Sequence, residues 1–130
     1  MKIKKIKKII QKIFKEHGLS INHAKLCSEA LLNAELVGAP SHGLSRLKMY
    51  CDRIKHKIIN PKPKIKIKRI SQSISHVDAD NSIGFVAANV GVDVAIKNAK
   101  KTGIGLVAIK NSGHYGLSGY YVEQAVKKNL

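Results

Sequence analysis

The sequence is poor in acidic and aromatic residues. It has 8 Asp and Glu against 24 Lys and Arg, which gives a formal net charge of +16 over 130 residues. Aromatic residues make up 5% of the chain, and tryptophan is absent. Because proteins that hold single-stranded nucleic acid stack its bases on aromatic rings, this composition disfavours a specific nucleic-acid partner. A basic nucleic-acid-binding module without catalysis is kept as an alternative, since charge alone supplies non-specific affinity.

Cysteines and long apolar runs are also scarce. The two cysteines, Cys27 and Cys51, belong to no CxxC motif and fall among apolar helix positions. They are therefore predicted to be buried free thiols rather than a disulfide or a metal site. Charged residues interrupt every apolar run, so the sequence indicates neither a secretory signal nor a membrane-spanning segment. We expect a cytoplasmic protein with a real hydrophobic core and no membrane partner.

Residues 1–58 are expected to form a helical segment. Isoleucines at helical spacing, separated by lysines, predict a first amphipathic helix. A second helix is expected to start at an N-cap on Ser20 and to run to about Val37. A third helix is expected to start at Ser41, which follows a proline, and to run toward His56.

Residues 59–130 predict a β-hairpin followed by β-α units, which makes the fold class α/β. A proline-containing break at Asn60–Pro63 separates this segment from the helices, and isoleucine then alternates with lysine as in a half-exposed strand. The expected elements are a strand around Ile65–Ile67, a strand at Ile74–Asp78, a turn at Asp78–Ser82, a helix at Gly84–Lys101 with a C-cap at Gly103, a strand at Leu106–Ile109 buried on both faces, and a helix at Tyr120–Asn129.

The third helix carries the first candidate site. His42, Arg46 and Tyr50 are four residues apart, so they would share one polar face of a helix that begins at Ser41. An arginine can bind a carboxylate bidentately, and a histidine can exchange a proton near neutral pH. The free N–H groups at the helix start would also favour an anion. The alternative is an ordinary amphipathic helix with a solvated polar side.

A second histidine lies in a glycine-rich loop after the last predicted strand. Ligands of α/β proteins bind at the carboxyl ends of strands, and His114 lies at such a position. The loop glycines Gly113, Gly116 and Gly119 are spaced by three, which does not match the dinucleotide fingerprint. Together with His42 and Arg46, His114 would make a general acid–base site with a carboxylate anchor. The alternative is a surface loop histidine.

A metal site is not predicted. His76, Asp78 and Asp80 alternate along one expected strand face and would suit a hard metal, but aspartates near turns usually cap backbone groups. A metal-assisted lyase or hydrolase using His42, His114 and Asp80 is the catalytic alternative to the enzyme class considered next.

Three motifs, in order and at matching intervals, resemble the type-2 malate/L-lactate dehydrogenase family. They are Pro40–Tyr50 (PSHGLSRLKMY), Asp78–Gly84 (DADNSIG) and Asn111–Tyr121 (NSGHYGLSGYY). That family includes ureidoglycolate, sulfolactate and diketogulonate oxidoreductases. The likeness covers nearly the whole chain. In the second motif, Ala79 and Ser82 stand where glycine is usual.

The resemblance implies an NAD- or NADP-dependent oxidoreductase of 2-hydroxy and 2-keto acids, with a non-Rossmann α/β fold and a homodimeric assembly. It implies that His42 and His114 are the catalytic histidines and that Arg46 binds the substrate carboxylate. Tyr50, Ser41 and Asn111, from the same motifs, are included among the substrate-binding residues.

Family members are more than twice as long as this chain, so the resemblance implies that the main cofactor-binding segments lie beyond Leu130. Residues 1–130 are then the N-terminal part of a larger malate/L-lactate dehydrogenase-type fold. A separately encoded C-terminal half is a possible partner. We expect weak or absent cofactor binding and no turnover by the 130 residues alone.

Overall fold

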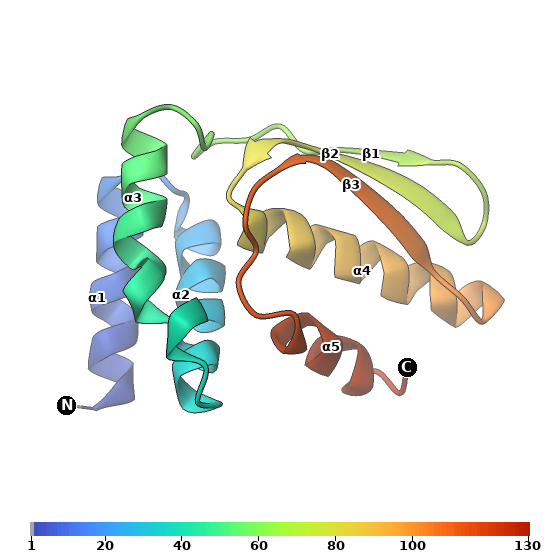
Figure 1. Ribbon diagram of the computed structural model, residues 1–130. Coiled ribbons are helices and arrows are strands. Elements are labelled where there is room, and N and C mark those ends of the chain that lie inside the picture. Colours follow the sequence, from blue (N-terminus) through green and yellow to red (C-terminus); the bar gives the residue numbers. More distant parts are fainter. Residues whose placement is uncertain (1) are drawn as a thin grey trace.

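The computed structural model describes residues 2–130. Three helices pack side by side next to a three-stranded sheet, and the sheet lies over α4, with α5 on the far side of that helix (Figure 1). The helices are α1 (Ile3–Glu16), α2 (Ile21–Leu36), α3 (Leu47–Lys55), α4 (Gly84–Thr102) and α5 (Gly119–Val126), and the strands are β1 (Lys66–Arg69), β2 (Ile74–Ser82) and β3 (Leu106–Ser112).

The first two predicted helices are confirmed. In α1 the buried side chains are Ile10 and Phe14, four residues apart, so the isoleucine pattern does place one apolar stripe against the rest of the protein. The α2 helix begins after Ser20, whose hydroxyl accepts a hydrogen bond from the backbone N–H of His23 at 3.1 Å. Cys27 is fully buried in α2, as the sequence predicts.

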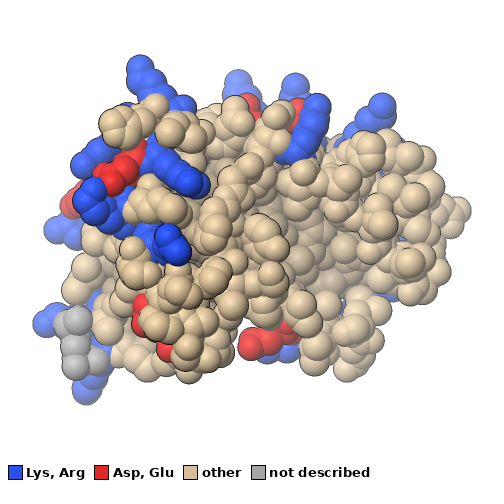
Figure 2. Space-filling view, in the orientation of Figure 1, with Lys and Arg blue, Asp and Glu red and all other residues tan. Residues whose placement is uncertain are grey.

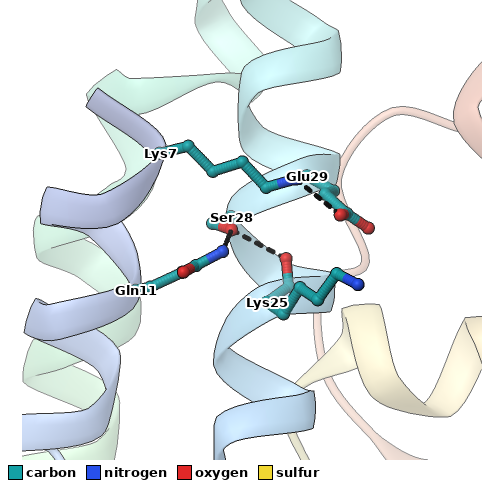
Figure 3. Close-up of polar contacts among 5 residues, drawn as sticks. All are labelled: Lys7, Gln11, Lys25, Ser28 and Glu29. Atoms are coloured by element: carbon teal, nitrogen blue, oxygen red, sulfur yellow. Dashed lines mark hydrogen bonds and ion pairs between the residues drawn. The ribbon is translucent and has the colours of Figure 1, made fainter. Parts of the chain in front are cut away.

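Polar contacts fix how α1 and α2 face each other. The Lys7 ammonium donates to the Glu29 carboxylate at 2.6 Å, one helical turn away from a hydrogen bond of 3.2 Å from the Gln11 amide to the Ser28 hydroxyl (Figure 3). Ser28 in turn donates to the backbone carbonyl of Lys25 at 2.7 Å. The interface between these helices is therefore apolar along its core and pinned by hydrogen bonds along one side.

The predicted hairpin is confirmed, but β2 extends past its expected end. The expected half-buried face of β1 is wrong, because all four of its residues are exposed. β1 pairs with β2 in antiparallel fashion, and β2 pairs with β3 in parallel fashion through the α4 crossover. The predicted turn at Asp78–Ser82 is wrong, because this segment continues the strand. Asp80 and Asn81 have φ of 51° and 54°, and they form an irregularity in the ladder instead of reversing the chain.

The prediction that β3 is buried on both faces is also wrong. Leu106 is 54% exposed and Ile109 is 38% exposed. The reason is positional, since β3 pairs only with β2 among residues 2–130 and α4 covers only one face of the sheet. Its apolar side chains are thus present but uncovered.

Helix α4 is confirmed, together with its C-cap at Gly103, which has the left-handed φ of 82°. Its small residues allow close contact with β3: the Ile109 side chain occupies the space where a Cβ of Gly91 would lie. None of the helices described between residues 2 and 130 combines the length and the apolar character needed to cross a membrane.

A close backbone contact lies at the first residue of α4. Gly84 lies against the backbone carbonyls of Gly113 and His114, so that a Cβ at Gly84 would overlap the His114 oxygen. The obstacle is backbone, which cannot rotate away as a flexible side chain can. The glycine therefore lets the loop after β3 pass over the start of α4.

We predict that Gly84→Ala destabilises the protein by about 1–3 kcal/mol, because the added methyl group overpacks this contact. The matched control is Gly119→Ala, which changes the first residue of α5, where nothing lies within 4 Å of the added Cβ. Urea unfolding followed by circular dichroism measures both variants. Equal midpoints for Gly84→Ala and the wild type would show that the loop does not depend on this glycine.

Candidate active site

The segment that begins the third predicted helix is broken into turns. Pro40–His42 and Leu44–Arg46 form single 3-10 turns, and the α-helix starts only at Leu47. The predicted continuous helix from Ser41 is therefore wrong. Gly43 has a ψ of −136°, which is outside the helical region and interrupts the helical hydrogen-bond ladder between the two turns.

The predicted N-cap at Ser41 is wrong as well. The Ser41 hydroxyl lies 3.0 Å from Nδ1 of His42 and caps no backbone N–H. Glu35 of α2 supplies the anion for these turns instead, because its carboxylate accepts from the backbone N–H of Leu44 at 2.6 Å. A Cβ at Gly43 would overlap this carboxylate, so the glycine is what lets Glu35 approach.

A backbone carbonyl of the first turn holds the Arg46 side chain. The Nε of Arg46 donates to the carbonyl of Ser41 at 2.7 Å, and the side chain is exposed. This contact uses the inner nitrogen only and leaves the two terminal nitrogens of the guanidinium for a ligand. Those two nitrogens are the ones that form parallel hydrogen bonds to a carboxylate.

Tyr50 joins the helical segment to the glycine-rich loop. It is fully buried, its ring lies 4.8 Å from that of Phe85, and its hydroxyl lies 2.6 Å from Nδ1 of His114. The predicted polar face is thus only partly correct, since Tyr50 is a core residue whose hydroxyl alone reaches the site. Burial raises the pKa of the Tyr50 phenol, which therefore stays protonated and donates this hydrogen bond.

The two candidate histidines come together. The rings of His42 and His114 are stacked, with centroids 5.8 Å apart and an interplanar angle of 23°. They derive from turns 72 positions apart in the sequence, counted from 42 to 114. Two imidazoles at this separation can both reach one oxygen atom of a small ligand.

The hydrogen bonds around His114 assign its tautomer. Nδ1 faces two donors, the Tyr50 hydroxyl and the backbone N–H of Gly116 at 3.3 Å, so this nitrogen is the acceptor. The neutral ring then carries its proton on Nε2. That nitrogen is left to donate a hydrogen bond to a ligand.

Positive charge surrounds His114. The residue is exposed as a whole, but the ring is desolvated beside buried Tyr50, and this is the main cause that lowers the pKa of His114 below its ordinary value. The charges of His42, Arg46 and Arg53 lower the pKa further, in that order. His114 is therefore neutral at pH 7, in a setting that attracts an anion.

Two contacts anchor the middle of the loop that carries His114. Gly116 has a left-handed φ of 80°, and the Phe85 ring fills the space where its Cβ would lie. At the preceding residue, the Tyr121 hydroxyl donates to the carbonyl of Tyr115 at 2.7 Å. The loop therefore owes its shape to two aromatic residues on α4 and α5.

Asn111 lies at the end of β3, with a left-handed φ of 52°. Its amide donates to the Asp78 carboxylate at 2.9 Å, which ties the end of β3 to β2. The neighbouring Asp80 carboxylate accepts from the Asn60 amide at 3.0 Å and from the backbone N–H of Lys64 at 2.8 Å. Both aspartates thus hold loops and strands together, and residues 2–130 contain no group of three side chains able to hold a metal ion.

Sequence reasoning missed three residues of the site. Arg53 lies on α3, seven positions after Arg46, and a search for the next residue on the predicted helical face would have found it. Phe85 and Glu35 carry no such signal. They act from α4 and α2 by packing against a glycine of a distant segment, which only the fold reveals.

The start of α4 and the glycine-rich loop show no cradle for a phosphate group. Gly113 and Gly119 face open space rather than a packed cradle, and the start of α4 is covered by the loop carbonyls against Gly84. A phosphate would need free N–H groups at such a helix start.

Comparison with known proteins adds the wider context. A family model described as malate/L-lactate dehydrogenase matches residues 1–130. The L-sulfolactate dehydrogenase of Methanocaldococcus jannaschii is 37% identical over 124 residues, which cover 95% of this chain and 36% of that protein. The malate dehydrogenase of Pyrococcus abyssi is 39% identical over 121 residues, which cover 93% of this chain and 33% of that protein.

A solved structure agrees with the fold. That of sulfolactate dehydrogenase from Methanocaldococcus jannaschii superimposes with a TM-score of 0.95 and 36% identity, covering 99% of this chain and 38% of that one. The chain thus spans about a third of the length of the relatives that it matches.

We predict that His114 titrates below the ordinary histidine pKa of about 6.5 and that Arg46→Gln raises this pKa, because a nearby positive charge is removed. Ring NMR signals followed between pH 4 and 8 measure the change, and Arg69→Gln, on exposed β1, is the control for loss of one charge. Since the folded pKa lies below the unfolded one, this group favours folding fully above the unfolded pKa, and that stability is lost as pH falls. A His114 pKa that does not respond to Arg46→Gln would contradict the electrostatic account.

Proposed function

The chain belongs to the malate/L-lactate dehydrogenase family, and from this premise we propose that it forms the substrate-binding part of an oxidoreductase. The reaction interconverts a small 2-hydroxy acid and the matching 2-keto acid with a nicotinamide cofactor, NAD or NADP. One observation carries the proposal: two stacked histidines lie beside an exposed arginine, and a buried tyrosine fixes the tautomer of one histidine.

Arg46 binds the substrate carboxylate in this proposal. Its Nε is held by the Ser41 carbonyl, so its terminal nitrogens are presented in one orientation, and little side-chain entropy is lost when they bind. Ser41 thus contributes through its backbone. The positive charge of Arg53 adds to the attraction for an anion without a separate role in the chemistry.

The two histidines have different roles at the substrate oxygen: one donates a hydrogen bond and the other exchanges the proton. Oxidation of a hydroxy acid removes a hydride from C2 and a proton from the oxygen, and the residues of this chain account for the proton. Neutral His114 donates from Nε2 to the substrate oxygen and polarises it, as the tautomer requires. His42 accepts the proton in the oxidation and returns it in the reduction.

Tyr50 and Asn111 are positioning residues. Tyr50 donates to Nδ1 of His114 and so keeps Nε2 protonated toward the ligand. Asn111 ties the last residues of β3 to Asp78, immediately before the loop that carries His114. The metal-assisted alternative lacks support, because the Asp80 carboxylate that it requires is committed to Asn60 and Lys64.

The experiment that tests the proposal is binding of L-malate and L-lactate to the 130-residue chain, followed by the ring NMR signals of His42 and His114. We expect saturable shifts of both rings. Arg46→Lys keeps the charge but loses the planar fork, and a hydrogen bond to a charged group is worth about 1.5–3 kcal/mol, so affinity should fall on the order of 10- to 100-fold. Arg69→Lys is the control, because Arg69 lies on β1 with its Nε bonded to the Ser71 carbonyl at 3.0 Å. Equal affinity in Arg46→Lys and the wild type would remove Arg46 from the site.

A separate prediction concerns the cofactor. Since the loop glycines lack the dinucleotide fingerprint, we expect no saturable binding of NADH or NADPH by residues 1–130 alone, and no reduction of pyruvate or oxaloacetate. Fluorescence titration measures the binding of NADH and NADPH, and an activity assay measures the reduction of pyruvate or oxaloacetate. Tight binding with turnover would show that the glycine-rich loop does hold a dinucleotide.

A further inference from the structure

Positive charge gathers on the solvent-facing side of α1. The helix contains six lysines and one glutamate. Five of the lysines are exposed, and each of these lies three, four or seven positions from another, so they share one helical face. That face is opposite the side on which Ile10 and Phe14 are buried. We call it the α1 lysine stripe, and its members are Lys4, Lys5, Lys8, Lys12 and Lys15.

Acidic side chains neutralise little of this stripe. The sixth lysine of α1, Lys7, is turned toward α2 and pairs with Glu29 at 2.6 Å. Within the stripe, Lys12 lies 3.9 Å from Glu16, but the two side chains are 79% and 60% exposed, so water screens their attraction. None of the ion pairs formed within residues 2–130 involves Lys4, Lys5, Lys8 or Lys15. Neighbouring charges of one sign therefore add up to a positive potential along α1.

The positive surface continues beyond the end of α1. A groove of about 760 Å³ is lined by residues at the ends of α1 and α3, with Lys55 and Lys57 beside Glu16. Both lysines are exposed, and they outnumber the single acidic residue of the groove. Figure 2 shows Lys and Arg side chains along the left side of the molecule, where Figure 1 places α1 and α3. The stripe is thus part of a larger basic surface rather than an isolated row.

The length of the stripe fits a polyanion with regularly spaced charges. From Lys4 to Lys15 the helix rises about 16 Å, since each residue adds about 1.5 Å. One strand of duplex DNA has a phosphate about every 3.4 Å along its axis, so this length faces about five phosphates. The stripe has one lysine for each of them. We propose that the α1 lysine stripe binds the phosphate backbone of duplex DNA, independently of base sequence, as an activity beyond the proposed dehydrogenase chemistry.

Two other polyanions fit the stripe less well. Proteins that hold single strands stack the bases on aromatic rings, and the only aromatic residue of α1, Phe14, is fully buried. A helix that lies on a membrane inserts its apolar side chains into the lipid. In α1 such side chains, Ile10 and Phe14, are instead packed in the hydrophobic core. A surface of lysines contacts phosphates and not bases, which favours a duplex.

The test is binding of the 130-residue chain to a fluorescein-labelled DNA duplex of about 20 base pairs, or two helical turns. Fluorescence anisotropy measures the binding constant between about 50 and 200 mM NaCl. With five phosphates neutralised, the logarithm of this constant should fall against the logarithm of the salt concentration with a slope of about −4.5. Two duplexes of unrelated sequence should give the same curve. In the triple variant Lys4→Gln, Lys8→Gln and Lys15→Gln, two contacts remain and the slope should shrink to about −1.8.

The matched control is the triple variant Lys97→Gln, Lys100→Gln and Lys101→Gln on α4. It removes the same three charges from exposed positions of another helix. Glutamine has nearly the helix propensity of lysine, so both triple variants should keep the circular dichroism spectrum of the wild type. The control should also keep the wild-type salt slope. Equal slopes in the two triple variants would show that net charge alone acts, and would overturn the proposal.

Three further results would also overturn it: an affinity that depends on the duplex sequence, tighter binding to a single strand of the same length, or retention on phosphatidylserine vesicles at salt concentrations that release the duplex. The L-malate titration described above separates DNA binding from the proposed chemistry. The lysine variants should leave the histidine ring shifts unchanged, and Arg46→Lys should leave DNA binding unchanged.

Discussion

The hydrogen bond between the Tyr50 hydroxyl and Nδ1 of His114 is the contact on which the site depends. It bridges 64 residues, joining a helix of the N-terminal bundle to a loop of the sheet segment. Without it, the tautomer of His114 would be set by the Gly116 N–H alone. The bond exists because Tyr50 is held in the core by Phe85, at the start of α4, and because that loop passes directly over Gly84. Packing and chemistry are therefore supported by the same few residues.

Much of the fold follows from local patterns. Three local signals are confirmed: the isoleucine period of α1, the Ser20 cap and the Gly103 cap. The Ile–Lys alternation correctly predicts a strand in a hairpin, but all four residues of that strand are exposed. The site was harder to derive. His42 and Arg46 were expected on an uninterrupted helix, but Gly43 and the distant Glu35 carboxylate convert that helix start into two turns.

The exposure of β3 shows a second limit of sequence reasoning. A run of apolar residues predicts a strand that needs covering on both faces, yet it does not say which chain segment does the covering. Here the run is confirmed as a strand while its burial is not. Composition has the same limit. It gives the net charge of +16, but only the fold shows that the groove between α4, β3 and α5 is lined by uncharged residues.

The parallel pairing of β2 and β3 has a consequence for how the protein folds. The helices α1 and α2 are neighbours in sequence and can associate early, whereas β2 and β3 meet only after the whole of α4 has closed the loop between them. Contacts of such long sequence separation form slowly, because loop-closure entropy opposes them until packing is complete. His42 and His114 are therefore stacked only in molecules whose crossover has already formed. The histidine pair thus depends on contacts between segments that are far apart in the sequence.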